Sequence, residues 1–197
     1  MNLKHILLTS LLLAAGVAQA TALDFTGAGS NSTPIAQTFG DGATWDITYL
    51  DVNANNSLLN WSTGYHNTTG VLWASGNDAS SWGRITITPT SGNQVTVNTF
   101  DLSPYLSNGP SFGTNWAVYA VGGSAAWTPE TLTALKTLSP SFTSSAGVVI
   151  EWRNSAYNVG IDNINFEVTA VPEPETYAMM LAGLGALGFM ARRRQGK

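Results

Sequence analysis

Residues 148–153 read Val-Val-Ile-Glu-Trp-Arg and residues 161–168 read Ile-Asp-Asn-Ile-Asn-Phe-Glu-Val. In both stretches apolar residues stand at every second position, which is typical of a strand with one face buried and the other in solvent. The same alternation recurs at residues 45–49, 84–88 and 94–98, between clusters of Gly, Asn, Ser and Pro. The sequence therefore predicts half-buried antiparallel sheets.

Three further segments complete the expected fold. Residues 116–121 are apolar on both parities and predict a central strand, and Phe100 and Leu102 shift the parity of residues 95–97, as a β-bulge does. Residues 128–138 predict one short helix, because a threonine N-cap and a proline precede leucines at helical spacing. The expected fold is all-β, a β-sandwich and more specifically a jelly roll, over residues 21–170.

The composition excludes several classes of protein. The 197 residues include no cysteine, so a disulfide scaffold, a Cys-ligated zinc, an iron–sulfur cluster and a thiol nucleophile are all ruled out. The formal net charge of −4 argues against a nucleic-acid partner, which requires a basic surface.

The N-terminus has the pattern of a secretory signal peptide. Lys4 precedes an apolar run over residues 6–17, and Ala18-Gln19-Ala20 forms an A-x-A cleavage site. As a helix the run would reach only about 18 Å, well short of a bilayer core of about 30 Å. We expect export by the Sec machinery and cleavage by signal peptidase after Ala20, so that residues 1–20 are removed.

The C-terminus contains three blocks in a fixed order. Residues 171–176 read Val-Pro-Glu-Pro-Glu-Thr, residues 177–191 carry no charge, and three arginines follow at 192–194. One interpretation is an ordinary tail anchor, a transmembrane helix whose arginines stay in the cytoplasm. At about 22 Å the apolar block is marginal for that role.

The order of these blocks resembles the PEP-CTERM sorting signal of Gram-negative bacteria. The family's VPEP-x-T pattern is matched by Val171, Pro172, Glu173, Pro174 and Thr176, its Gly/Leu-rich helix by residues 181–188, and its basic end by Arg192, Arg193 and Arg194. The resemblance implies recognition of the tail by a membrane-embedded exosortase and its removal near the Pro-Glu-Pro site, after an inner-membrane intermediate held by the C-terminal helix. It further implies a secreted protein of the cell surface or extracellular matrix, with a structural or adhesive role in exopolysaccharide or biofilm.

Few residues of the central domain are suited to catalysis. His66 is its only histidine. A Ser-His-Asp triad would have to use it, but no G-x-S-x-G nucleophile elbow is present. One histidine is also too few for the usual set of zinc ligands. A glycoside hydrolase would need two carboxylates on one face, and Glu151 and Glu167 are the strand-borne glutamates. Both stand at the polar parity and are expected to face solvent separately, so we do not expect an enzyme.

Asp162 stands at an unusual position. It shares the parity of Ile164 and Phe166 and is therefore expected to be buried. A buried carboxylate needs backbone donors, an ion pair or a metal. Two interpretations are open: Asp162 accepts backbone hydrogen bonds that secure the last strand, or it binds Ca²⁺ together with Asp41. The stretch resembles the last strand before the motif in many PEP-CTERM proteins, and jelly-roll carbohydrate-binding modules often hold calcium near such strands.

The aromatic residues indicate a second function class. Residues 21–170 contain ten acids, three bases and all seven tryptophans. The polar segment around residues 61–82 holds Trp61, Tyr65, Trp73 and Trp82, whose rings could stack on sugars in a carbohydrate-binding module. That function requires exposed, coplanar rings, whereas tryptophan is usually buried in the core. We expect Trp61 and Trp82 to be the exposed exceptions.

Overall fold

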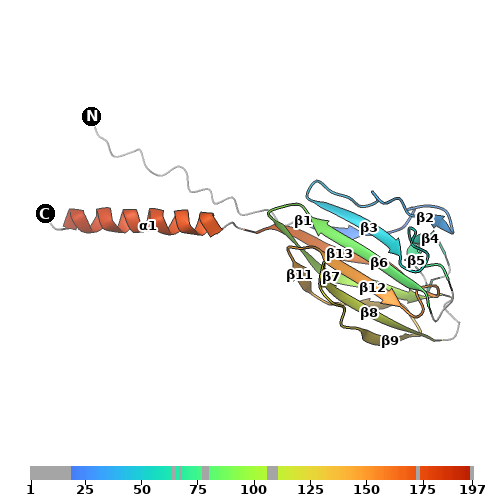
Figure 1. Ribbon diagram of the computed structural model, residues 1–197. Coiled ribbons are helices and arrows are strands. Elements are labelled where there is room, and N and C mark those ends of the chain that lie inside the picture. Colours follow the sequence, from blue (N-terminus) through green and yellow to red (C-terminus); the bar gives the residue numbers. More distant parts are fainter. Residues whose placement is uncertain are drawn as a thin grey trace. The chain divides into compact units, whose positions relative to one another are not determined.

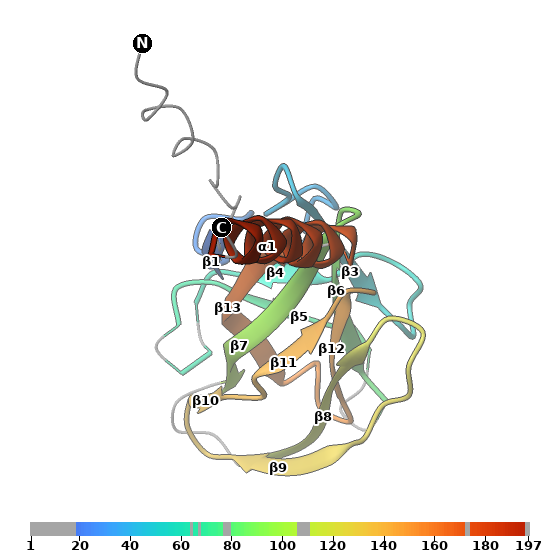
Figure 2. The same cartoon turned by 90° about the vertical axis from the view of Figure 1, so that its left-hand side faces the viewer.

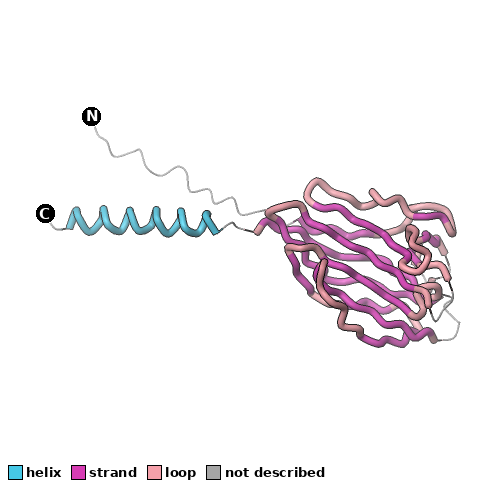
Figure 3. Tube along the Cα trace, viewed as in Figure 1, coloured by secondary structure: helices cyan, strands magenta, loops and turns pink. Residues whose placement is uncertain are grey.

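The computed structural model describes residues 19–63, 65–66, 68–76, 80–105, 111–171 and 174–195 (Figure 1). The chain divides into two compact units, of which residues 18–171 form one. This unit consists of strands and loops, and the described part of the other contains a single helix (Figure 3).

The first sheet has five antiparallel strands in the order β3-β6-β12-β8-β9 (Figure 1). Its strands are β3 (Trp45–Asp51), β6 (Trp82–Pro89), β8 (Phe112–Ala120), β9 (Thr128–Leu132) and β12 (Val148–Arg153). The alternating stretch at residues 148–153 thus lies in the middle of this sheet. β8 contains most of the predicted central strand and is likewise flanked on both sides.

The second sheet has eight strands and is built around two long ones, β7 and β13, which pair along most of their length (Figure 2). Its main order is β10-β7-β13-β5-β4-β2, with β1 paired to β13 and β11 paired to β7. Its strands are β1 (Gln19–Leu23), β2 (Thr33–Pro34), β4 (Leu59–Trp61), β5 (Val71–Trp73), β7 (Asn93–Pro104), β10 (Lys136–Leu138), β11 (Phe142–Ser144) and β13 (Val159–Ala170).

The predicted β-sandwich is confirmed. The long strands β6, β7 and β8 alternate between the two sheets, as do β12 and β13, which is the jelly-roll pattern. Buried side chains of both sheets form one core, in which the Trp45 ring meets the Phe166 ring edge-on at 5.5 Å. Trp152 is fully buried in this core, and its Nε1 donates to the carbonyl of Val159 at 2.8 Å.

The predicted bulge is also present. The register pairs Phe166 with Val97 and Asn165 with Thr99, so β7 contains one extra residue between them. A second shift follows Asp162, and Asn163 there has a positive φ of 49°. Such irregularities move side chains from one face of a sheet to the other, which explains why a single parity does not run through either strand.

The helix predicted at residues 128–138 is wrong. The segment forms β9, which pairs with β8, and β10, which pairs with β7. Leu132 and Leu138, placed at helical spacing in the sequence, are both buried in the sandwich core. Pairing with strands distant in the sequence therefore overrides the local helix signals.

The helix of the second unit is α1 (Pro174–Gln195), which begins at a proline, a favoured first helical position. The predicted transmembrane helix is not found, because no helix in the described part of the chain is long and apolar enough to cross a membrane. Residues 1–18, including Ala18, and Pro172 and Glu173 lie outside the described residues. Ala20 belongs to β1, and the signal peptide stays a prediction.

Candidate functional site

Aromatic side chains gather on the outer face of the eight-stranded sheet. In β4 and β5, Leu59 pairs with Trp73 and Trp61 with Val71, while Leu72 between them belongs to the sandwich core. Alternation along a strand therefore turns Trp61 and Trp73 away from the core. Tyr65, Val71 and Trp73 form a small hydrophobic cluster separate from the main one.

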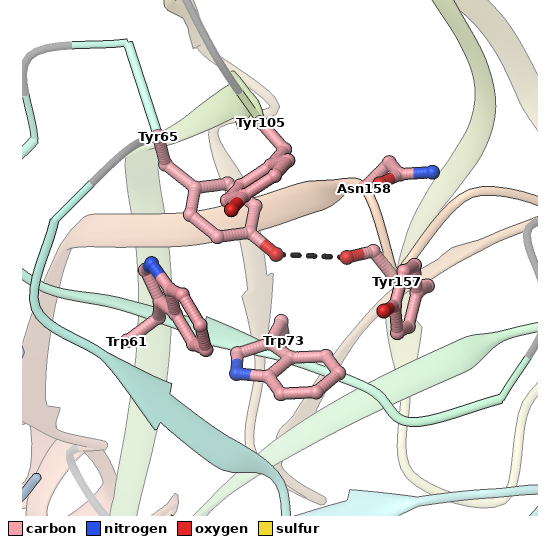
Figure 4. A pocket seen from close by; sticks show the side chains of 6 residues that line it. All are labelled: Trp61, Tyr65, Trp73, Tyr105, Tyr157 and Asn158. Atoms are coloured by element: carbon pink, nitrogen blue, oxygen red, sulfur yellow. Dashed lines mark hydrogen bonds between the residues drawn. The ribbon is translucent and has the colours of Figure 1, made fainter. Parts of the chain in front are cut away.

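Two residues of this cluster, Tyr65 and Trp73, line a cavity of about 80 Å³. We call this cavity the aromatic pocket. Its walls are Trp61, Tyr65, Trp73, Tyr105, Tyr157 and Asn158. In Figure 4, Trp61, Tyr65 and Tyr105 lie on one side, Tyr157 and Asn158 lie opposite, and Trp73 lies below. The Tyr65 hydroxyl spans the two sides by donating to the carbonyl of Tyr157 at 2.7 Å.

The rings of the pocket meet edge to face. Trp61 crosses Trp73 at 84° and Tyr105 at 82°, so the coplanar platform expected for a glycan-binding module is not formed. Trp61 and Tyr105 are half-buried and Tyr157 is 43% exposed, so these rings are open to a ligand.

Trp73 forms the floor of the pocket and is only 8% exposed. Its Nε1 is buried and has no hydrogen-bond partner among the residues that the structure describes. A buried donor without an acceptor costs about 1–3 kcal/mol.

The strand pairing of the sheet holds the walls in place. Tyr105 bridges to Tyr65 and donates its backbone N–H to the carbonyl of Asn158 at 2.7 Å. Gly160, at the start of β13, lies directly beneath the pocket. A Cβ atom there would come within 2.6 Å of Val71 and 3.0 Å of the Tyr65 ring.

The structure brings together three of the four aromatic residues predicted as a glycan surface. Trp61, Tyr65 and Trp73 line one pocket; Trp73 is buried, and Trp61, which was expected to be exposed, is half-buried. Sequence reasoning missed Tyr105 and Tyr157 because they are far along the chain from the aromatic segment at residues 61–82. Tyr105 follows β7, and Tyr157 follows β12. Only the pairing of β13 with β5 and β7 places them beside β4 and β5.

Trp82 lies instead on the five-stranded sheet and is half-buried, although it was expected to be exposed. Its ring is 5.9 Å from that of Trp127, and the Arg153 guanidinium lies beside both rings, stacked on Trp127. Trp82 therefore belongs to a second aromatic surface and not to the aromatic pocket.

The prediction that Glu151 faces solvent is wrong. Glu151 is 1% exposed and accepts a hydrogen bond from Nε of Arg84 at 2.5 Å. Burial, with a hydrogen bond to Glu151 next, raises the pKa of neighbouring Tyr119 to about 12. Glu167 lies in β13 of the other sheet, so the two glutamates do not share a face.

Asp162 is 3% exposed, which confirms the predicted burial. Its Oδ1 accepts the backbone N–H of Phe25 at 3.2 Å and so ties β13 to the chain that follows β1. Burial raises the pKa of Asp162 to about 6, hydrogen bonds from the Phe25 and Asn163 amides oppose the shift, and the charge of Asp24 adds to it.

The predicted calcium site stays a prediction. The second proposed ligand, Asp41, accepts the backbone N–H of Ile47 at 2.7 Å. Within the described ranges, no group of three or more His, Asp or Glu side chains is arranged to hold a metal ion. His66 is half-buried, and its Nδ1 has no hydrogen-bond partner among the described residues.

Comparison with known families identifies the C-terminal segment. Residues 170–194 match the PEP-CTERM protein-sorting motif. The resemblance inferred from Val171 to Arg194 is thereby confirmed. The motif indicates an exported protein that is sorted to the cell surface and implies processing by an exosortase.

Solved structures with a similar chain trace include three carbohydrate-related proteins. The CBM22-1 xylan-binding domain of Paenibacillus barcinonensis Xyn10C has a TM-score of 0.36 and 10% identity, over 81% of this chain and 97% of that one. The Podospora anserina GH26-CBM35 β-(1,4)-mannanase has a TM-score of 0.35 and 11% identity, over 68% of this chain and 29% of that one. A Clostridium perfringens CBM32 module in complex with GalNAc-β-1,3-galactose has a TM-score of 0.30 and 15% identity, over 78% and 95%. No curated protein matches the chain.

Proposed function

We propose that this exported protein binds carbohydrate through the aromatic pocket, and that its sorting motif delivers that activity to the cell surface or extracellular matrix. The observation that carries the proposal is the composition of the outer sheet face. Five aromatic rings and Asn158 surround one cavity on a surface that a monomeric sandwich would normally present to water as polar side chains.

The chemistry of the walls matches that of a sugar. The face of a pyranose carries C–H groups that pack on aromatic rings, and Trp61 and Tyr157 offer such surface. Sugar hydroxyls require polar partners, and Asn158 is a polar residue in the pocket walls. Because the rings cross at steep angles, one sugar unit, such as a chain end or a side branch, fits better than a flat polysaccharide surface.

The cellular role follows from the combination of the two units. A sugar-binding domain released near the Pro-Glu-Pro site would attach to exopolysaccharide, giving it a structural or adhesive role in a biofilm. This role also requires the predicted signal peptide, the Sec machinery and signal peptidase for export.

A glycan array probed with the purified protein, with and without EDTA, tests the proposal. We expect binding to a set of glycans that share one terminal sugar unit. Trp61→Ala should weaken binding by about tenfold or more, equivalent to about 1.4 kcal/mol or more. The matched control is Val121→Ala, which removes exposed apolar atoms outside the pocket. Absence of glycan binding in both conditions would contradict the proposal.

A further inference from the structure

The outer face of the five-stranded sheet carries a second group of functional side chains. Arg153 ends β12 and pairs in register with Trp82 of β6 on one side and Asn115 of β8 on the other. Trp152, the preceding residue, points into the core, where its ring occupies the space beside Gly83. Alternation therefore turns Arg153 outward, in the same row as Trp82.

Two tryptophans hold the Arg153 guanidinium. Its Cζ lies 3.7 Å from the centroid of the Trp127 ring and 5.8 Å from that of the Trp82 ring. The two rings lie 5.9 Å apart and cross at 75°. Stacking of this kind fixes the plane and position of the guanidinium but leaves its charge without a counterion.

Arg153 differs from the other two basic residues of this domain, which are both paired with an acid. Residues 21–170 contain only three bases against ten acids. Arg84 is paired with Glu151 and Lys136 with Glu130, at 2.5 and 2.6 Å. The described residues offer Arg153 no carboxylate within ion-pair distance, although acids are in excess.

Two hydrogen-bond donors at the same place also lack acceptors. Nε of Arg153 and Nε1 of Trp82 are both buried and have no hydrogen-bond partner in the part of the chain that the structure describes. Glu151, on the same face of β12, is already paired with Arg84 and does not compete strongly for Arg153.

We propose that Trp82, Trp127 and Arg153 form a second binding site, for a carboxylated sugar unit of an acidic polysaccharide. The planar guanidinium matches a carboxylate, to which it can donate two parallel hydrogen bonds. The two indole rings beside the guanidinium provide apolar surface on which the sugar ring packs. This site lies on the opposite sheet from the aromatic pocket and does not depend on it.

The test is isothermal titration calorimetry of the purified full-length protein with a short oligogalacturonate. The comparison ligand is the same oligosaccharide after chemical reduction of its carboxyl groups. We expect the carboxylated form to bind about tenfold tighter or more than the reduced form. Equal affinity for the two forms, or no binding of either, would overturn the proposal.

Variants assign the binding to these residues. Arg153→Gln should abolish the preference for the carboxylated form, and Arg153→Lys, which keeps the charge without the planar fork, should restore it only in part. The matched control is Lys136→Gln, which removes one positive charge elsewhere and should leave the preference intact. If Arg153→Gln lowers the melting temperature but leaves the preference unchanged, the arginine has only a structural role and the proposal fails.

The same titration separates this site from the aromatic pocket. Trp61→Ala should leave the binding of oligogalacturonate unchanged, and Trp82→Ala should weaken it. If Trp61→Ala abolishes that binding and Arg153→Gln does not, the acidic sugar enters the pocket. In that case the second site is refuted while the proposed function stands.

Discussion

Replacing Asp162 by asparagine removes a buried charge and keeps the oxygen that accepts the backbone N–H of Phe25. Burial raises the pKa of Asp162 to about 6 in the folded protein, whereas an unfolded aspartate titrates near about 3.9. Between these values the folded state binds more protons than the unfolded state. The free energy of unfolding that depends on Asp162 is therefore highest below about pH 4 and falls as the pH rises through about 6.

The size of the effect follows from the shift. A difference of about two pKa units corresponds to about 3 kcal/mol at neutral pH. We expect Asp162→Asn to be more stable than the natural protein at about pH 7.5, by up to about 3 kcal/mol, and nearly equal to it at about pH 4. The variant should also lose the decline in stability between these two pH values.

Urea unfolding followed by tryptophan fluorescence over this pH range measures the effect. A variant that is less stable than the natural protein at neutral pH, with an unchanged pH dependence, would refute the reasoning. Repeating the series with Ca²⁺ and with EDTA tests the calcium interpretation. If Asp162 and Asp41 bind calcium, the ion stabilises the natural protein but neither Asp162→Asn nor Asp41→Asn.

Three other perturbations have defined outcomes. Arg84→Ala leaves the buried Glu151 without its ion-pair partner and should cost about 3 kcal/mol of unfolding free energy, whereas Glu151→Gln leaves an arginine that reaches water and should cost less; equal losses in urea unfolding would contradict this asymmetry. Gly160→Ala should displace the Tyr65 ring. It should clearly weaken glycan binding at the aromatic pocket while lowering the melting temperature only slightly. Replacing residues 172–174 by alanines should block processing, and an unchanged mass and cell fraction would contradict the sorting role.

The fold was predictable wherever one face of a strand is buried. The alternation at residues 148–153 and 164–168 identified two central strands, and the broken parity around Phe100 identified a real bulge. The segment at 128–138 was misread because its threonine, proline and leucines are also a good helix start. Only the partners Phe112 and Leu102, distant in the sequence, show that it forms strands.

The functional sites were predictable only in part. Trp61, Tyr65 and Trp73 are close in the sequence, so composition alone pointed to them. Tyr157 reaches the pocket through sheet pairing, and Glu151 is buried because the side chain opposite it in the register is Arg84. Neither of these two sheet pairings is visible in the local sequence. The sorting motif, in contrast, is a continuous stretch of sequence and was identified in full.

The central claim is that a sugar unit enters the aromatic pocket, and the indole N–H signals of the seven tryptophans test it most directly. In ¹⁵N-labelled protein titrated with a glycan selected on the array, the indole signal of Trp73 should shift, because a sugar in the pocket changes the surroundings of its ring. The signal of Trp61 should shift as well. Trp152, whose Nε1 is already bonded to Val159, should stay in place. Saturable binding that leaves the Trp61 and Trp73 signals unmoved would contradict the claim.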